Sequence, residues 1–327
     1  MSDLKTTALR VIELPSETNG SFAPALIQNA GSAAQFAWEE FFYGAIRNPH
    51  TRRAYGHATK QFLAWCHTRG LELHQVSPRD VGHYFDGLGV ATVTQKLHLA
   101  AIRRLFDFLV NRHAVLLNPA ATVRTERHQA IEGKTPEIAV DQVRRLLASI
   151  DTETVVGLRD RAIIAILVYT AARIGAVSKL QRQHFYDAGD QHCLRFNEKG
   201  GKSREIPARH DLQRYLSEYL AAAGLADAEK QTPLFLAAVR RTGVLTTTAL
   251  TSGDMGRMIK RRMRDAGLPS RLSPHSFRVT TITDLLSQGV PLEDVQFLAG
   301  HADPRTTRLY DRRQRRVTRN IVERISI

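Results

Sequence analysis

The chain has 327 residues, which exceeds the usual length of one domain, so we expect two domains with short tails. Its net charge of +14, from 46 Lys and Arg against 32 Asp and Glu, favours a polyanionic partner such as nucleic acid. A solvated basic surface would give the same charge. Hydrophobic and charged fractions of 43% and 24% are ordinary for a globular protein and argue against disorder.

The sequence also argues against secretion, membrane insertion and zinc binding. Its two cysteines, Cys66 and Cys193, belong to no Cys-x-x-Cys or Cys/His pattern. Residues 1–19 contain no apolar core of signal-peptide length, and the longest nearly apolar run, 162–172, is shorter than the ~20 residues that span a bilayer. We therefore expect a protein of the reducing cytoplasm that has no membrane partner.

The N-terminal third predicts a small helical bundle. Residues 1–32 show no sustained apolar period and are interpreted as a flexible tail. Ser77 followed by Pro78 is a helix start, and Gly70 lies where a helix should end. Apolar residues then recur at helical spacing, so we expect a helical domain over 33–119 with helices at 35–46, 51–69, 78–88 and 92–112.

A polar, basic, proline-bounded stretch over 120–135 is interpreted as a linker, and a second domain should follow it. Two predicted strands, 193–197 and 204–207, flank Glu198–Lys202, whose paired glycines suit a hairpin turn. Helices are expected at 140–150, 155–170, 211–223, 252–266, 274–288, 292–298, 305–309 and 312–324. The fold class is thus mainly α with a small antiparallel β-hairpin, the second domain being α+β.

His275 and Arg278 are the first candidates for chemistry. Spaced i and i+3 on a helix, they share one face and can converge on a single anion. The planar fork of an arginine matches the non-bridging oxygens of a phosphate. Taken alone, a surface histidine and a solvated arginine on a helix that buries Ile282 and Leu286 would be the more ordinary interpretation.

A longer motif changes this balance. Gly300-His301 is followed by Thr306-Thr307 and then by Tyr310, nine residues after the histidine. This stretch resembles the C-terminal signature of the tyrosine recombinases, the phage-integrase or Xer-like family. Arg173 looks like the family's first catalytic arginine, and Lys199 in the predicted hairpin looks like its catalytic lysine. The similarity covers residues 136–311, and the upstream bundle is similar to the family's SAM-like, DNA-binding core-binding domain.

The resemblance implies a site-specific recombinase with a catalytic domain of the DNA breaking-rejoining type over 136–311. Tyr310 would attack a DNA phosphodiester and form a 3′-phosphotyrosyl link, and strand exchange would pass through a Holliday junction, in integration or excision of a mobile element. A phenol needs a proton acceptor near neutral pH, and we expect His275 to be that base. Arg173 and Arg278 would clamp the phosphate, His301 would donate a further hydrogen bond, and Lys199 would protonate the leaving 5′ oxygen.

Double-stranded DNA is the expected partner, and no cofactor, ATP or metal is expected. One bond is exchanged for another of similar energy, and Phe196 stands where a P-loop before Gly201-Lys202-Ser203 would need its first glycine. In this family the C-terminal tail often docks on a neighbouring protomer. Residues 312–327 are therefore expected to form an oligomerisation helix, with a dimer on each site and a tetramer in the synapse.

The sequence departs from the family pattern at two positions. Ala171 replaces a frequent glycine two residues before Arg173, and Ala176 replaces an acid three residues after it. The missing acid should weaken the support of a neighbouring cation. Each site residue also has a purely structural interpretation, such as a helix cap, a turn lysine or a half-buried aromatic. Two alternatives stay open: a catalytically silent DNA-binding regulator, and an enzyme like the type IB topoisomerases.

Overall fold

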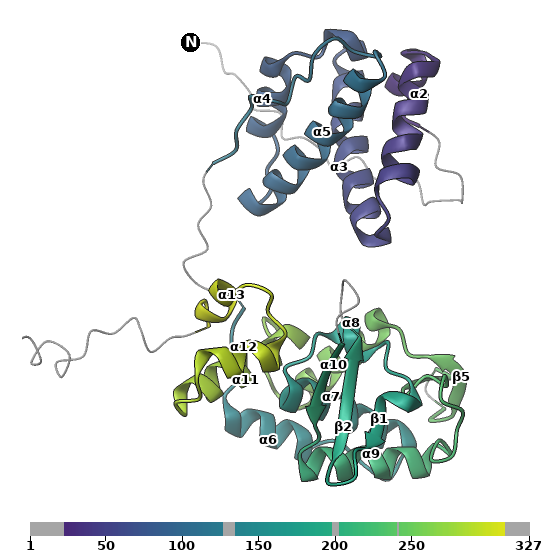
Figure 1. Ribbon diagram of the computed structural model, residues 1–327, viewed down its shortest axis with the longest axis vertical. Coiled ribbons are helices and arrows are strands. Elements are labelled where there is room, and N and C mark those ends of the chain that lie inside the picture. The colour runs from purple at the N-terminus through teal and green to yellow at the C-terminus, as the bar shows by residue number, and fades with distance from the viewer. Residues whose placement is uncertain (1–22, 127–134, 198–202, 241, 311–327) are drawn as a thin grey trace, which may run out of the picture. The chain divides into compact units, whose positions relative to one another are not determined.

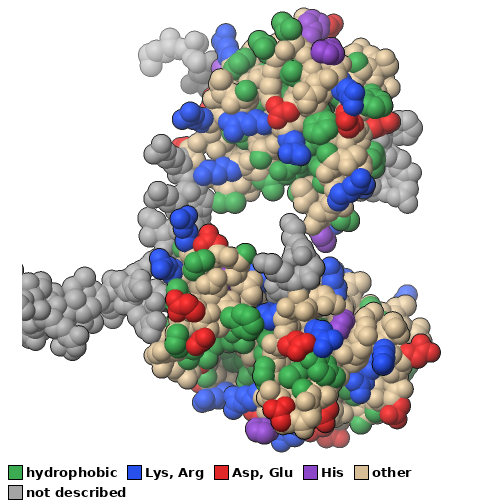
Figure 2. Space-filling model, viewed as in Figure 1, with side chains coloured by type: hydrophobic (Ala, Val, Ile, Leu, Met, Phe, Trp, Pro, Cys, Tyr) green, Lys and Arg blue, Asp and Glu red, His purple; other side chains and the backbone are tan. Residues whose placement is uncertain are grey.

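The computed structural model describes residues 23–126, 135–197, 203–240 and 242–310. The chain divides into two compact units, residues 1–129 and 130–327 (Figure 1). The described residues are mostly helical and add two small antiparallel sheets, which confirms the predicted fold class. Figure 2 shows Lys and Arg side chains on both units, interspersed with acidic ones on the side drawn. None of the described helices is both long and apolar enough to span a bilayer.

The N-terminal unit is a helical bundle around an aromatic core. Trp38, Phe41, Phe62 and Phe106 are all buried in it. Helix starts follow the expected chemistry, since the Ser77 side chain accepts from the backbone N–H of Asp80 with Pro78 in the first turn. The elements are α1 (Ala25–Asn29), α2 (Ser32–Glu39), the π-helix η1 (Glu40–Ala45), α3 (Pro49–Thr68), the 3₁₀ turn η2 (Leu73–Gln75), α4 (Pro78–Asp86) and α5 (Thr92–Asn111).

Two features of this unit differ from the prediction. The tail assigned to residues 1–32 ends in helix α1, whose Leu26 and Ile27 are buried against the bundle. Five residues are too few to show a helical period, so the sequence alone did not reveal this helix. The helix predicted at 35–46 is α2 continued by the π-helix η1, in which Phe41 and Phe42 both point into the core.

The second unit is built around one buried helix, α7. Its residues Ala162–Leu167 are buried without interruption, which is the pattern of a helix covered on all sides. Helices α9 and α11 pack against it (Figure 1). The helices of the unit are α6 (Val140–Ala148), α7 (Val155–Thr170), α8 (Ile174–Val177), the 3₁₀ turn η3 (Arg182–His184), α9 (His210–Ala222), α10 (Ser252–Asp265), α11 (Pro274–Ser287), α12 (Leu292–Ala299) and α13 (Pro304–Arg308).

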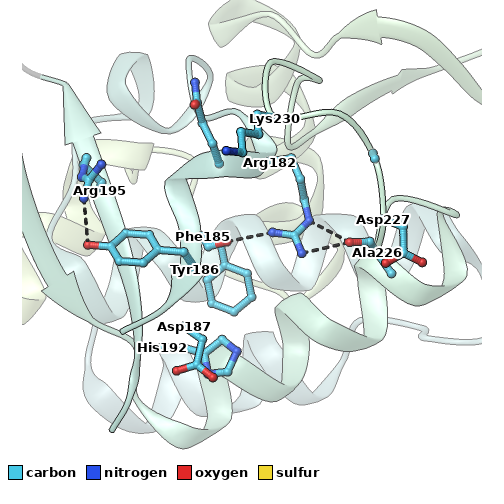
Figure 3. Close-up of a pocket in the computed structure, with 11 residues that line it drawn as sticks. Arg182, Phe185, Tyr186, Asp187, His192, Arg195, Ala226, Asp227 and Lys230 are labelled. Carbon is cyan, nitrogen blue, oxygen red and sulfur yellow. Dashed lines mark hydrogen bonds between the residues drawn. The ribbon is translucent and has the colours of Figure 1, made fainter. Parts of the chain in front are cut away.

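A three-stranded antiparallel sheet, in the order β1-β2-β3, lies in this unit. Its strands are β1 (Phe185–Asp187), β2 (His192–Asn197) and β3 (Ser203–Pro207). Strands β2 and β3 are the predicted pair, in register from Cys193↔Pro207 to Asn197↔Ser203. The second sheet, β4 (Leu236–Ala238) with β5 (Leu245–Ala249), was not predicted. A pocket of about 670 Å³ lies beside β1 and η3 (Figure 3). The hairpin tip 198–202 and the helix predicted at 312–324 lie outside the described residues.

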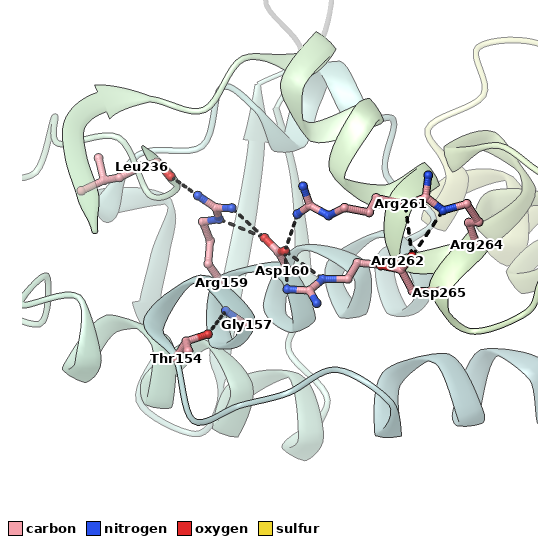
Figure 4. Close-up of polar contacts among 9 residues, drawn as sticks. All are labelled: Thr154, Gly157, Arg159, Asp160, Leu236, Arg261, Arg262, Arg264 and Asp265. Atoms are coloured by element: carbon pink, nitrogen blue, oxygen red, sulfur yellow. Dashed lines mark hydrogen bonds and ion pairs between the residues drawn. The ribbon is translucent and has the colours of Figure 1, made fainter. Parts of the chain in front are cut away.

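A buried ionic network joins α7, α10 and β4 (Figure 4). The carboxylate of Asp160 is fully buried and accepts from Arg159 at 2.8 Å and from Arg262 of α10 at 2.9 Å. Arg159 also donates to the carbonyl of Leu236 at 2.8 Å. A buried charge pair of this kind adds little net stability, but removing one partner costs about 3–5 kcal/mol because it strands the other. The network therefore fixes α10 against the helix whose far end leads into Arg173.

Candidate active site

Arg278 is the most deeply buried of the predicted site residues that the structure describes, with 1% of its surface exposed. It lies on α11, which starts with Pro274 in its first turn, so His275 and Arg278 share the N-terminal part of that helix. The Arg278 guanidinium donates from one terminal nitrogen to the carbonyl of Ala171, and from the other to the carbonyl of Ala299 at 2.6 Å. Arg278 therefore links the ends of α7 and α12 to α11.

Both of these carbonyls lie at helix C-termini that end in a left-handed residue. Helix α7 is followed by Ala171 at φ 49°, and α12 is followed by Gly300 at φ 62°. A left-handed residue ends a helix and turns the chain away, and the last carbonyls carry the negative end of the helix dipole. The family's preference for glycine at position 171 matches this geometry, because a residue with a Cβ is strained there.

His301 follows directly after Gly300 and is buried, with 7% of its surface exposed. Its backbone is tied to Gln296, whose carbonyl accepts from the His301 N–H at 3.1 Å and whose side chain donates to the His301 carbonyl at 3.0 Å. Its Nδ1 lies 2.8 Å from the hydroxyl of Thr307 on α13. If that hydroxyl donates to Nδ1, the remaining ring proton sits on Nε2 and can be donated to an anion.

Tyr310, the second residue after α13, completes the cluster. The side chain of Asp303 caps α13 by accepting from the Arg305 N–H at 2.8 Å, and the Tyr310 N–H donates to the Thr307 carbonyl at 3.0 Å. The phenol ring stacks on the His301 ring, with centroids 5.8 Å apart and planes at 7°. Its hydroxyl lies 3.2 Å from Nε2 of His275. One predicted nucleophile and one predicted base thus meet at hydrogen-bond distance.

Arg173 is held differently from Arg278. It is the N-cap residue of the short helix α8, and its side chain is exposed. No ion pair or side-chain hydrogen bond of Arg173 is found within the described ranges. The missing acid is visible in this arrangement, because Ala176 packs against the apolar core of the unit where the family often places a carboxylate. Arg173 is nevertheless close enough to act electrostatically on both histidines.

Burial, and after it the positive charges nearby, lower the pKa of both histidines and favour the neutral imidazoles. Loss of hydration, followed by the charges of Arg278 and Arg173, lowers the pKa of His275 below its ordinary value of 6.5, although this side chain still reaches solvent. For His301, burial is again the largest cause, and nearby cations add to it, so the pKa falls to about 3. A neutral His275 can accept a proton near neutral pH.

Two residues join the cluster that sequence reasoning gave no role. Thr307 is fully buried and orients His301, and its only sequence signal was membership of the Thr-Thr pair. Arg204 on β3 is buried over the ring of Phe196, and its charge is among those that lower the pKa of His301. Lys199 lies outside the described residues, so its place relative to the cluster is not part of this geometry. No group of metal-ligating side chains occurs in the described part of the chain.

Comparisons with known proteins match both units of the chain. The phage integrase family profile matches residues 137–316, and the phage integrase N-terminal SAM-like domain matches residues 43–113. Tyrosine recombinase XerC of Pelobacter propionicus is 30% identical over 271 residues, which is 80% of this chain and 84% of that protein. Tyrosine recombinase XerD of Ralstonia nicotianae is 29% identical over 271 residues, 82% of this chain and 84% of that protein.

Solved structures show the same fold. The XerH site-specific recombinase bound to palindromic difH substrate gives a TM-score of 0.66 at 19% identity, over 90% of this chain and 84% of that one. A lambda integrase (75–356) dimer bound to a COC′ core site gives 0.65 at 16% identity, over 87% of this chain and 96% of that one. The relatives named above are tyrosine recombinases, and in this fold the Tyr310 hydroxyl lies 3.2 Å from Nε2 of His275. The chain belongs to the phage integrase family and is a site-specific recombinase of that class.

Proposed function

We propose that this recombinase cuts and rejoins double-stranded DNA through a covalent 3′-phosphotyrosyl link to Tyr310. The observation that carries the proposal is the 3.2 Å separation between the Tyr310 hydroxyl and Nε2 of His275. A nucleophile within hydrogen-bond reach of a neutral base is the arrangement that activates a hydroxyl. The surrounding guanidinium groups supply the positive charge and the hydrogen-bond donors that bind a phosphate anion.

The first step transfers one phosphoryl bond. The Tyr310 oxygen attacks the phosphorus, its proton passes to Nε2 of His275, and the bond from phosphorus to the 5′ oxygen breaks. Lys199 gives a proton to that leaving oxygen, so a free 5′-hydroxyl results. Religation runs the same steps in reverse with a 5′-hydroxyl from a second strand, which gives a Holliday junction. Since each phosphodiester is exchanged for a phosphotyrosyl ester of similar energy, the cycle consumes no ATP.

Charge on the phosphate increases in the transition state, and the site is built to oppose it. Arg173, which is exposed, is able to approach a phosphate from solvent, while Arg278 contributes its charge from beneath, held by two carbonyls. His301, neutral with its Nδ1 against Thr307, offers an Nε2 proton to a non-bridging oxygen. Arg204 adds positive potential from β3. Preorganised donors of this kind are worth about 10²–10³ in rate each.

We assign DNA binding to both units, with residues 33–119 as the core-binding domain, 120–135 as the linker and 136–311 as the catalytic domain. The lambda integrase and XerH structures named above contain DNA, and the net charge of +14 here suits the same partner. We also propose a dimer on each site and a tetramer in the synapse, joined through residues 312–327. The biological setting we propose is integration or excision of a mobile element in the cytoplasm, where Cys66 and Cys193 remain thiols.

The proposal is tested by covalent capture of DNA. The wild-type protein is mixed with nicked duplexes of randomised sequence, and protein-linked DNA is recovered after denaturation and sequenced. The wild type should yield an adduct with one enriched sequence, hereafter the captured site. Tyr310→Phe should bind the captured site with unchanged affinity and yield no adduct, because it loses only the nucleophilic oxygen. Persistence of the adduct in this variant would falsify the assignment.

The same capture separates the two alternatives named from the sequence. A catalytically silent regulator would enrich a bound sequence without any covalent product from the wild type. An enzyme like the type IB topoisomerases would form the adduct and relax supercoiled DNA, but two captured sites placed on one plasmid would not exchange strands. We expect exchange between the two sites.

A further inference from the structure

The exposed side chain of Arg173 is placed by the short helix α8. The Arg173 carbonyl accepts from the backbone N–H groups of Ala176 at 2.8 Å and Val177 at 3.1 Å, which fixes its main chain to the first turn of that helix. The side chain extends from this turn and is exposed. The position of α8 therefore sets where the Arg173 guanidinium can meet a phosphate.

Helix α8 is in turn supported by α10. A helix of four residues is not stable alone, and α8 packs against α10. Gly256 of α10 faces Ile174 of α8, since a Cβ at this glycine would lie 3.8 Å from Cδ1 of Ile174. Both helices contribute to the same apolar core. A shift of α10 along its axis would therefore move α8, and Arg173 with it.

The apolar face of α10 fixes the position of this helix only weakly. Its buried residues are Met255, Met258, Ile259 and Met263. Methionine is unbranched and has three rotatable bonds, so a face made mostly of methionines can pack in several ways at similar energy. Apolar contacts alone would hold α10 against the core without fixing its place along its own axis. A directional contact is needed for that.

The ion pair between Arg262 and Asp160 is such a contact (Figure 4). Nε and Nη2 of Arg262 donate to one carboxylate oxygen of Asp160, at 3.0 and 2.9 Å. Nε and Nη2 of Arg159 donate to the other oxygen, at 3.1 and 2.8 Å. The Asp160 side chain is fully buried, and that of Arg262 is 21% exposed. Each oxygen of one buried carboxylate thus holds one guanidinium, which defines one position of α10 against α7.

The ion pair and the contact with α8 lie at different ends of α7. Asp160 is in the second turn of α7, whereas Ile174 comes after its C-terminal end. On α10, the two contacts are made by Arg262 and Gly256, which lie about 9 Å apart along the helix axis. Helix α10 is therefore fixed near the start of α7 and supports α8 beyond its end.

We propose that Asp160 and Arg262 are positioning residues for Arg173, a proposal that rests on the phosphate-binding role proposed above for Arg173. Without the ion pair, α10 would keep its methionine-rich contacts but could shift along α7, and α8 would shift with it. A misplacement of about 1 Å can cost up to about 10²-fold in rate. Loss of the ion pair should therefore slow cleavage about tenfold, although neither residue touches DNA.

A double-mutant cycle tests this role. Arg262→Met keeps an unbranched side chain and leaves the buried pair of Arg159 and Asp160 in place. Single-turnover adduct formation on the captured site, with protein in saturating excess, should be about tenfold slower than in wild type. Arg173→Ala should lose about 10²-fold or more. In the Arg173→Ala background, Arg262→Met should cost less than about twofold, because the side chain that it positions is gone.

Two further variants complete the design. Arg145 bonds Asp141 at 3.0 Å within helix α6, so Arg145→Met removes the same charge and the same kind of ion pair without separating two elements. This matched control should cleave at the wild-type rate. Arg262→Lys keeps the charge but not the fork, so it disturbs folding less and should show the same pattern with a loss of about threefold. Circular dichroism checks that each variant is folded at the assay temperature.

The outcomes separate the two proposals. A normal rate for Arg173→Ala would overturn the role proposed for Arg173 itself. If Arg173→Ala is slow, the positioning role is overturned by either of two results. In one, the Arg262 variants cleave at the wild-type rate; in the other, they slow both backgrounds by the same factor, which is what a purely structural ion pair would do.

Discussion

The two sides of the candidate site are built in different ways. The nucleophile side, His275, Arg278, His301 and Tyr310 on α11 to α13, is mostly buried and bonded to its surroundings. On the opposite side, Arg173 at the start of α8 has an exposed side chain, and strands β2 and β3, paired from Cys193↔Pro207 to Asn197↔Ser203, end at the exposed Asn197. On the first side, Arg278, His301 and Tyr310 are part of the buried interior. On the second, Arg173 projects from the short helix α8.

This difference suggests that the two sides contribute to activity in different ways. Electrostatic stabilisation works best when charges and hydrogen-bond donors are fixed before the reaction, as the charge of Arg278 and the neutral ring of His301 are by their hydrogen bonds. A side chain that is to contact DNA must be exposed before the DNA binds, and the side chain of Arg173 is exposed. Substitutions on the buried side should therefore lower both the cleavage rate and the free energy of unfolding. Substitutions on the exposed side should lower the cleavage rate alone.

The largest effects are expected for Arg278→Lys and Arg173→Lys, which should both slow cleavage but differ in folding stability. Lysine cannot reproduce the paired donors of a guanidinium, so both variants should lose about 10²-fold or more in the rate of adduct formation. Only Arg278→Lys should also lower the free energy of unfolding, by about 2–4 kcal/mol, because it loses bonds to two buried carbonyls. Arg173→Lys should stay within about 0.5 kcal/mol of wild type.

Urea denaturation followed by circular dichroism measures the stability difference, and single-turnover capture of the nicked duplex measures the rate. Equal stabilities for the two variants would contradict the view that the sides differ in their coupling to the fold. A normal rate for either variant would remove that arginine from the site.

The pH dependence of cleavage should reveal how the exposed side acts on the buried one. The pKa of His275 lies below 6.5 through loss of hydration and the charges of Arg278 and Arg173. As a base it works when neutral, so the rate should be flat above that pKa and fall about tenfold per pH unit below it. Arg173→Gln removes one of the positive charges and should move the midpoint upward, towards 6.5.

The measurement is single-turnover adduct formation between pH 4.5 and pH 8 for both proteins, at one salt concentration because exposed charges are screened by salt. A wild-type midpoint above 6.5 would contradict the assignment of His275 as the base. A midpoint that moves downward in Arg173→Gln would contradict the electrostatic coupling between the sides.

A smaller effect is expected at Thr307, which orients His301 within the buried side. Thr307→Val keeps the shape but removes the hydroxyl 2.8 Å from Nδ1, leaving that buried nitrogen without its partner. We expect about 1–3 kcal/mol of lost stability and about tenfold slower cleavage. Thr306→Val, at the partly exposed neighbour, is the matched control and should change neither quantity. Equal results for the two threonines would show that Thr307 does not orient His301.

The sequence predicted the long helices and most of the site, but for different reasons. Apolar spacing identified helices such as α5 and α7 because each has many turns over which a period can be seen. Strand β5, Leu-Thr-Thr-Thr-Ala, has no apolar alternation, and its pairing with β4 contains an irregularity, so it gave no signal. The π-helix η1 depends on packing of Phe41 and Phe42 that local sequence does not encode.

The residues of the site came from spacing, yet their roles in the structure depend on long-range contacts. The motif named Arg278 but not the two carbonyls that hold it, one of them 107 residues away in sequence. It named His301 but not the hydroxyl of Thr307 as its partner. The departure at position 171 could be seen in the sequence, whereas the left-handed backbone that strains an alanine there required coordinates. Pattern identifies such residues, and tertiary structure explains what supports them.

The smallest expected effect concerns the left-handed residues that end α7 and α12, Ala171 and Gly300. Gly300→Ala places a Cβ at φ 62° and should cost about 1 kcal/mol. Ala171→Gly relieves about as much backbone strain. Against this, the greater conformational entropy of glycine stabilises the unfolded chain by about 0.4–1 kcal/mol, and the loss of a buried methyl group costs about 0.8 kcal/mol. These terms nearly cancel, so the net change should lie within about 1 kcal/mol. Urea denaturation of both variants checks this, and a loss of 2 kcal/mol or more in Ala171→Gly would mean that the packing of the Ala171 methyl, rather than backbone strain, dominates where Arg278 is held.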